Sequence, residues 1–216
     1  MTRTAVMFDL DGTLLDTLED LGDAANAALR TRAYPEHDYA FYRHAVGDGA
    51  RNLITRSLPA AARDAATIEA MYAAMRANYT ANWHTKTRPY AGIPELLTGL
   101  LTRGIALAIL SNKPDDTAQA CVRHFFPDTP FAAVHGVLPG GPLKPDPVGA
   151  LSIVKRLGLP QEAWLYIGDT NTDMATARAA GLFAVGCTWG FRDRAELAAA
   201  GAAAIIDRPG ELLALV

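Results

Sequence analysis

Short apolar runs alternate with helical patterns along most of the chain. Three runs are uninterrupted, at residues 5–8, 105–110 and 164–167, and weaker ones occupy 131–134, 183–187 and 203–206. An unbroken apolar run is typical of a strand that is buried on both faces, as in a parallel sheet covered by helices. Helical patterns lie between the runs, at 94–103, 117–125, 147–157, 172–180 and 194–199. This order predicts an α/β fold with a doubly wound parallel sheet.

Residues 16–88 interrupt this alternation, because they contain no strand pattern. Instead, helical patterns cover 18–32, 38–46, 50–57 and 60–83. In the first of these, leucines and alanines recur at helical spacing and form one apolar stripe. We therefore expect residues 16–88 to form a small helical domain inserted after the first strand, and residues 1–15 and 89–216 to form the α/β core.

Acidic residues follow the first and third strong strands. Asp9 and Asp11 come after residues 5–8, and Asp169 and Asp173 come after residues 164–167. A single Asp-x-Asp pair is usually structural, but ligands bind beyond the carboxyl ends of parallel strands. We therefore expect these four carboxyl groups to meet at one edge of the sheet. A cluster of oxygen ligands without His or Cys suits Mg²⁺ better than zinc.

Charge adds a condition to any anion site. The net charge is −3 and the pI is near 5.9, so a general polyanion-binding surface is not indicated. A phosphate ester would need local cations and hydrogen-bond donors. Ser111 and Asn112 follow the second strong strand, and Lys144 lies in a Gly/Pro-rich loop. Lys113 is a second candidate cation, although a solvated surface lysine is the favoured interpretation.

Cellular location and partners are constrained by what the sequence lacks. Cys121 and Cys187 show no metal-ligand spacing, which favours two reduced cysteines in a cytosolic protein. No apolar run reaches membrane-spanning length, and the first apolar segment is too short for a signal peptide. We expect a cytoplasmic protein without nucleic-acid or membrane partners. Both a monomer and a homodimer remain open.

The strand-end residues, in their order, resemble the motifs of the haloacid dehalogenase-like hydrolase superfamily. The four segments are 8–17, 111–112, 144–145 and 168–173. Within the superfamily, segments 45–50, 90–97, 111–114 and 188–191 are most similar to phosphoglycolate phosphatases, although pyrophosphatases and sugar-phosphate phosphatases share several of them. The resemblance implies a Rossmann-like core and identifies the helical insertion as the α-helical cap domain.

The resemblance also implies roles for the acidic residues. Asp9 would be the nucleophile and form a phospho-aspartate, and Asp11 would be the general acid and base. Mg²⁺ would be held by the Asp9 side chain, the Asp11 backbone carbonyl and the Asp169 side chain. Thr13 and Asp173 would have supporting roles, with Thr13 helping to orient Asp11.

The remaining site residues are expected to recognise the substrate. Ser111, Asn112 and Lys144 would bind the phosphoryl oxygens, and the cap would present a substrate loop containing Gly47, Gly49 and Arg51. The predicted function is Mg²⁺-dependent hydrolysis of a small phosphate monoester, 2-phosphoglycolate first among them. The alternatives are a β-phosphoglucomutase-like phosphosugar mutase, a broad sugar-phosphate phosphatase, a pyrophosphatase, and a non-catalytic regulator with the same fold.

Overall fold

The computed structural model describes residues 3–216 and divides into two compact units. The first unit comprises the chain up to Leu15 together with Pro89–Val216, and the second comprises Asp16–Arg88. A two-stranded sheet, β2 (Leu15–Asp16) with β3 (Arg88–Pro89), lies where the chain leaves and re-enters the first unit. No helix of residues 3–216 is both long and apolar enough to cross a membrane.

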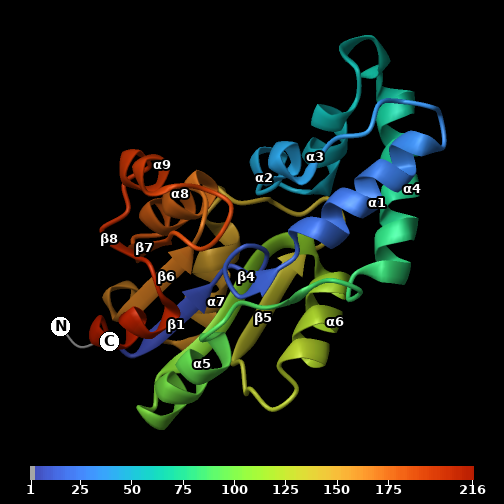
Figure 1. Cartoon of the computed structure of the whole chain (residues 1–216). Coiled ribbons are helices and arrows are strands. Elements are labelled where there is room, and N and C mark those ends of the chain that lie inside the picture. Colours follow the sequence, from blue (N-terminus) through green and yellow to red (C-terminus); the bar gives the residue numbers. More distant parts are fainter. Residues whose placement is uncertain (1–2) are drawn as a thin grey trace. The chain divides into compact units, whose positions relative to one another are not determined.

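The first unit is built on a six-stranded sheet in the order β5-β4-β1-β6-β7-β8 (Figure 1). Every strand pair in it is parallel, as the continuous apolar runs predict. The strands are β1 (Ala5–Phe8), β4 (Ala106–Pro114), β5 (Ala133–Val137), β6 (Trp164–Gly168), β7 (Phe183–Cys187) and β8 (Ala204–Ile206). The helices are α5 (Ile93–Thr102), α6 (Asp115–Phe125), α7 (Val148–Leu157), α8 (Asn171–Ala179) and α9 (Arg194–Ala199), with short 3-10 turns at Gln161–Ala163 and Pro209–Ala214.

The direction of winding reverses next to β1. The chain passes from β1 to β4 and β5 through α5 and α6, and then returns through α7 to β6, β7 and β8. Right-handed crossovers place helices of opposite winding direction on opposite faces of the sheet. The carboxyl ends of β1, β4 and β6 therefore meet at the point where an open α/β sheet binds ligands.

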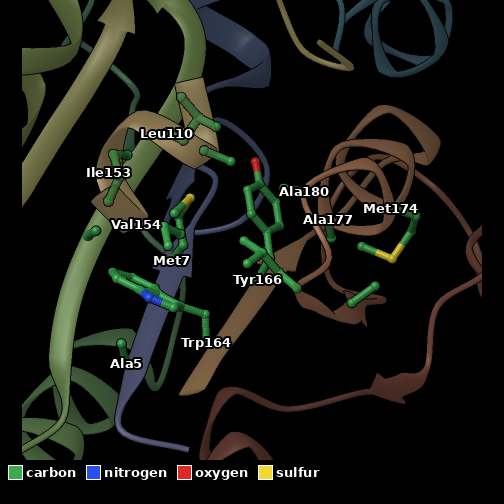
Figure 2. Close-up of a cluster of buried hydrophobic side chains, with 14 of the residues drawn as sticks. Ala5, Met7, Leu110, Ile153, Val154, Trp164, Tyr166, Met174, Ala177 and Ala180 are labelled. Carbon is green, nitrogen blue, oxygen red and sulfur yellow. The ribbon is translucent and has the colours of Figure 1, made fainter. Parts of the chain in front are cut away.

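Large apolar side chains fill the space between the sheet and α7, α8 and α9. Met7, Leu110, Trp164 and Tyr166 point from three adjacent strands into this layer (Figure 2). Because successive strand residues point to opposite faces, Val6 and Phe8 face the other layer, and both are fully buried. Burial on both faces explains why these strands appear in the sequence as uninterrupted apolar runs.

The central strand β4 extends further than its apolar run. The sequence places its end at Leu110, but the strand continues to Pro114 and includes Ser111, Asn112 and Lys113. The reason is pairing with β5, which resumes at Pro114 and Val137 after a shift in register. These polar residues are therefore fixed on a strand rather than placed in a loop.

Apart from the strand residues at its two ends, the regular structure of the second unit consists of helices joined by loops. It contains α1 (Leu18–Arg30), α2 (Tyr39–Ala45), α3 (Ala50–Ser57), a 3-10 turn (Ala60–Ala62) and α4 (Ala65–Asn82). The single helix expected over 60–83 is wrong at its start, because Asp64 caps α4 by accepting a hydrogen bond from the Thr67 amide. At the base of the unit, Asp20 of α1 accepts hydrogen bonds from the Thr87 amide and hydroxyl, both at 2.8 Å.

Candidate active site

Asp9 lies one residue beyond β1 and is almost fully buried. Its Oδ1 atom is 2.7 Å from the Lys144 ammonium and accepts a 2.7 Å hydrogen bond from the Leu10 amide. Lys144 comes from the loop between β5 and α7, and only 5% of it is exposed. The chain thus brings together a buried acid and a buried cation that are 135 positions apart in the sequence.

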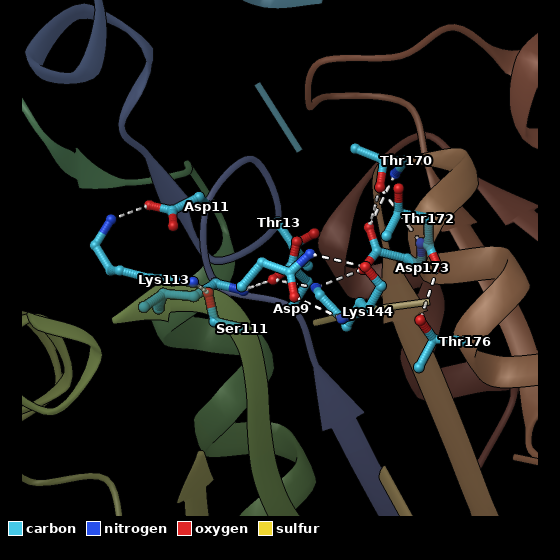
Figure 3. A network of polar contacts seen from close by, with 12 residues as sticks. Asp9, Asp11, Thr13, Ser111, Lys113, Lys144, Thr170, Thr172, Asp173 and Thr176 are labelled. Atoms are coloured by element: carbon cyan, nitrogen blue, oxygen red, sulfur yellow. Dashed lines mark hydrogen bonds and ion pairs between the residues drawn. The ribbon is translucent and has the colours of Figure 1, made fainter. Parts of the chain in front are cut away.

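Lys144 also contacts Asp173, on the first turn of α8. Its ammonium donates a 2.7 Å hydrogen bond to Oδ1 of Asp173 (Figure 3). The Tyr166 hydroxyl also donates to this oxygen. The other oxygen, Oδ2, accepts hydrogen bonds from the Thr170 amide and hydroxyl in a capping box. Both oxygens of Asp173 are thus used inside the protein, so its evident task is to hold Lys144 and the start of α8.

Asp169 is held from two sides. The Thr13 hydroxyl donates to Oδ1 at 3.0 Å, and the Phe191 amide donates to Oδ2 at 2.8 Å. The Trp189 ring nitrogen in turn donates to the Thr13 carbonyl. Thr13 therefore positions Asp169, and the structure shows no such contact with Asp11, which we expected it to orient.

Two glycines make room for Asp169. Gly12 has a φ of +88°, and a Cβ there would lie 2.3 Å from Oδ2 of Asp169. A Cβ at Gly190 would lie 2.3 Å from the Asp169 Cβ. Any side chain at either position would displace the carboxylate. The segment around Gly190 and Phe191 is thus part of the site, and the strand-end motifs did not reveal it. The signal was its Trp-Gly-Phe sequence just after an apolar run.

Asp11 lies apart from the other acids. Its Oδ1 atom accepts a 2.7 Å hydrogen bond from the ammonium of Lys113, whose side chain is 3% exposed. In Figure 3 this pair lies on one side of the site, and Asp9, Lys144 and Asp173 lie on the other. The interpretation of Lys113 as a solvated surface lysine is wrong, because β4 continues past Leu110 and carries Lys113 into the site.

Ser111 and Asn112 are fixed by local hydrogen bonds. The Ser111 hydroxyl accepts a bond from the Lys113 amide, and Ser111 is 2% exposed. The Asn112 side chain forms a reciprocal pair with the main chain of Lys144, donating to its carbonyl and accepting from its amide. Asn112 therefore anchors the loop that carries Lys144.

Three of the four predicted carboxylates form one cluster. Ligand oxygens of Asp9, Asp169 and Asp173 lie within 4.8 Å of one another, and all three residues are buried. Burial, and then the negative charge of Asp173, raise the pKa of Asp9 well above its usual range, against the opposing effect of Lys144. The same two causes raise the pKa of Asp169 to about 7.

The pKa of Lys144 is governed by the charges of its neighbours more than by its burial. Burial alone would lower its pKa, but Asp173 and Asp9 raise it well above the usual value, so it stays charged. One lysine therefore faces three carboxylates, and a further cation would relieve their mutual repulsion. An all-oxygen donor set with excess negative charge fits Mg²⁺.

The predicted cap loop lies in the second unit. Gly47 and Gly49 both have positive φ, at 124° and 97°, and Gly49 directly precedes α3. Asp48 between them pairs with Arg56 of α3, which holds the loop. Arg51, expected as a carboxylate clamp, forms an ion pair with Glu69 and lies 4.8 Å from the Tyr72 ring centroid. Its guanidinium is thus engaged by α4 within the same unit.

Comparison with known proteins agrees with this geometry. Residues 6–187 match the family model described as haloacid dehalogenase-like hydrolase. The chain belongs to the haloacid dehalogenase-like hydrolases. Among relatives in this family, the phosphoglycolate phosphatase of Mesorhizobium japonicum is 35% identical over 196 residues, covering 90% of this chain and 86% of that one. That of Rhodospirillum rubrum is also 35% identical, over 210 residues, covering 94% of this chain and 86% of that one.

Solved structures extend the likeness to the whole fold. A proposed phosphoglycolate phosphatase from Lactobacillus delbrueckii superposes with a TM-score of 0.94 at 29% identity, covering 100% of this chain and 98% of that one. A protein from Rhodobacter sphaeroides, solved in complex with phosphate, superposes with a TM-score of 0.81 at 22% identity, covering 98% and 96% of the two chains, and shows the fold alone. The predicted family, the α/β fold and the enzyme class, a phosphoric monoester hydrolase, are confirmed.

Proposed function

We propose that this hydrolase is a Mg²⁺-dependent phosphatase that converts 2-phosphoglycolate to glycolate and phosphate through a phospho-aspartate at Asp9. The observation that carries the chemistry is the buried cluster of Asp9, Asp169 and Asp173 around Lys144. The relatives named phosphoglycolate phosphatase, at 35% identity over most of the chain, support the choice of substrate.

In the first step, a carboxylate oxygen of Asp9 attacks phosphorus. Lys144 and the Leu10 amide both contact Oδ1 of Asp9, which fixes the orientation of the carboxylate for the attack. The bond from Asp9 to phosphorus forms as the bond from phosphorus to the leaving oxygen breaks. Protonated Asp11 gives its proton to that oxygen, which releases the alcohol. Lys144, 2.7 Å from Asp9, offsets the charge of the phosphoryl oxygens.

In the second step, water replaces the leaving alcohol. Asp11, now a carboxylate, accepts a proton from the water as its oxygen bonds to phosphorus. The bond between phosphorus and Asp9 breaks, which restores the Asp9 carboxylate and the proton on Asp11. Ser111, which is buried at the end of the apolar part of β4, and Lys144 are the proposed donors to the phosphoryl oxygens in both steps.

The side chains of Asp9 and Asp169 and the main-chain carbonyl of Asp11 are the proposed Mg²⁺ ligands. When bound, Mg²⁺ neutralises charge on the phosphoryl oxygens and keeps neighbouring carboxylates ionised. Asp173 takes a supporting role, because each of its oxygens already accepts two hydrogen bonds within the protein, whereas each oxygen of Asp169 accepts one. Thr13 and the Phe191 amide orient Asp169 toward this task.

The Asp16–Arg88 unit is the proposed cap, which excludes bulk water during the first step. Its loop with Gly47 and Gly49 would present main-chain groups to the substrate. Because Arg51 is paired with Glu69, it could bind a substrate carboxylate only after leaving that partner. Glu69→Gln, which weakens this pair, should lower KM for 2-phosphoglycolate if Arg51 is the clamp.

A phosphate-release panel tests the proposal. It compares kcat/KM for 2-phosphoglycolate, sugar phosphates, nucleotides and pyrophosphate, with Mg²⁺ and after chelation. We expect 2-phosphoglycolate to give the highest value, chelation to abolish turnover and added Mg²⁺ to restore it. Asp9→Asn is the matched inactive control. Turnover without metal contradicts the carboxylate site, and isomerisation of a sugar phosphate without phosphate release would instead identify a mutase.

A further inference from the structure

Lys113 is a buried cation that the proposed mechanism does not use. Its side chain is 3% exposed, and its ammonium lies 2.7 Å from Oδ1 of Asp11. A lysine is buried at a cost unless it is paired and hydrogen-bonded. The chain therefore has a physical reason to keep an acid opposite Lys113, and that acid is the proton carrier of the proposed reaction.

Strand pairing delivers Lys113 to this place. β1 and β4 run in parallel with Phe8 opposite Ile109, and β4 continues beyond this pair to Pro114. The chain after β1 turns at Gly12, where φ is +88°, and Asp11 precedes this turn. Lys113 is further fixed by its amide, which donates to the Ser111 hydroxyl. The main chain is therefore fixed at both Lys113 and Asp11.

The two buried lysines contact different acidic residues. Lys144 contacts Asp9 and Asp173, whereas Lys113 contacts Asp11, whose carboxylate is outside the cluster of Asp9, Asp169 and Asp173. Figure 3 shows the Asp11 side chain directed toward Lys113 and away from that cluster. An acid that must reach first the leaving oxygen and then a water molecule needs its position to be defined.

We propose that Lys113 is a positioning residue, which fixes the place of the Asp11 carboxylate and thereby sets the efficiency of proton transfer in both steps. The inference rests on the proposed function, since it assigns Lys113 a role through Asp11. Lys113 does not touch the phosphoryl group in this account. It differs from Lys144, whose contacts are with the nucleophile and with Asp173.

The test depends on the leaving group. Lys113→Met keeps the length of the side chain and removes its charge, and Lys155→Met changes an exposed lysine on α7 in the same way. Initial release of alcohol or phenol is measured in a single turnover, with an alkyl phosphate such as 2-phosphoglycolate and with p-nitrophenyl phosphate. Nitrophenolate is stable enough to leave as an anion, whereas the alkyl leaving oxygen must receive a proton as its bond to phosphorus breaks.

Lys113→Met should slow the alkyl phosphate by about tenfold or more, within the roughly 10²–10⁴-fold that general acid–base catalysis contributes. The p-nitrophenyl ester should be slowed by less than about threefold, because its first step needs no general acid. Lys113→Arg should recover part of the loss, and Lys155→Met should match the wild type on both substrates. Equal losses on both substrates would overturn the proposal, because a merely structural role does not depend on the leaving group.

A double-mutant cycle provides the second criterion. In the Asp11→Asn background, Lys113→Met should change steady-state hydrolysis of p-nitrophenyl phosphate by less than about twofold, because its partner is already neutral. If the losses of activity caused by Lys113→Met and Asp11→Asn add in the double variant, Lys113 does not act through Asp11. If Lys113→Met does not fold, as judged by circular dichroism, Lys113→Arg and the double variant decide by the same criteria. A wild-type enzyme that releases no phosphate from any ester refutes the proposed function, and this result is distinct from a failure of the Lys113 variants.

Discussion

Gly190→Ala is the smallest change that should disturb the site without altering any charge. The added Cβ would lie 2.3 Å from the Asp169 Cβ, 2.3 Å from the Gly12 carbonyl oxygen and 2.5 Å from Oδ2 of Asp169. Ordinary contacts begin near 3.4 Å, so one of these groups must move by about 1 Å. None of them is the end of a long flexible side chain, and Asp169 is fully buried.

The expected cost follows from this displacement. Overpacking in a close-packed interior lowers the unfolding free energy by about 1–3 kcal/mol. A misplacement of roughly 1 Å in a catalytic group lowers the rate by about 10²-fold. Because Asp169 is a proposed Mg²⁺ ligand, we expect kcat/KM to fall by about this factor and the apparent Mg²⁺ affinity to fall with it.

Gly210→Ala is the matched control, because the Cβ it would add has no heavy atom within 4 Å apart from those of its immediate chain neighbours and the local helix backbone. The assay measures phosphate release from 2-phosphoglycolate across a Mg²⁺ titration, together with the midpoint of urea unfolding for both variants. Gly210→Ala should match the wild type. If folded Gly190→Ala keeps kcat/KM and Mg²⁺ dependence within about threefold of the wild type, the account of Asp169 placement is refuted, because a shift of this size should cost far more.

Three further changes test other contacts. Lys144→Met should lower kcat by about 10²–10³-fold and, without metal, lower the unfolding free energy by about 3–5 kcal/mol; an unchanged urea midpoint would contradict the pairing with Asp9 and Asp173. In the metal-free protein the pKa of Asp169 is raised from 3.8 to about 7, so between these pH values the native state holds a proton that the unfolded state has lost. The unfolding free energy therefore falls as pH rises from 3.8 to about 7, by at most about 4 kcal/mol in total. When the unfolding free energy from urea titrations is plotted against pH, the slope for Asp169→Asn should be smaller than that of the wild type by the equivalent of one proton. An unaltered slope would refute the assignment of this proton to Asp169. Asp20→Ala should leave the buried Thr87 amide and hydroxyl without their acceptor, at about 1–3 kcal/mol each, and speed tryptic cleavage after Lys86; wild-type resistance would count against this contact.

The fold was predictable because its strands are buried on both faces. Burial of both Val6 and Met7, for example, requires apolar residues at every position of β1, and this leaves a visible run in the sequence. The end of β4 was not predictable in this way. Ser111 to Lys113 are polar because they line the site, and a polar stretch looks like a loop when only local pattern is available.

The start of α4 could not be predicted from helix propensity. The stretch from Ala60 is rich in alanine and contains no Gly or Pro up to Trp83, so helix propensity alone predicts one continuous helix. Asp64 ends this continuity by accepting the Thr67 amide hydrogen bond in an extended conformation. Capping competes with helix propensity over a single residue, and a periodic pattern does not resolve that competition.

The proximity of the strand-end acids was predictable, but the pairing of acids with lysines was not. Parallel strands deliver their carboxyl ends to one edge, so Asp9 and Asp169 were expected to lie near each other. Which lysine pairs with which acid depends on strand register and loop path over more than a hundred residues, as for Lys113 and Asp11. The Trp-Gly-Phe sequence marked the segment around Gly190, but a glycine does not show in the sequence which group it makes room for.

The central claim is that Asp9 carries the phosphoryl group. Asp11→Asn lacks the proposed base for the second step, and p-nitrophenyl phosphate needs no acid for the first, so this combination should accumulate the intermediate. The protein is mixed with this ester and Mg²⁺, quenched in acid, digested and analysed by mass spectrometry. The account predicts one phosphoryl group on the peptide that contains Asp9. Release of nitrophenolate with that peptide unmodified, or with the phosphoryl group on another residue, would contradict it.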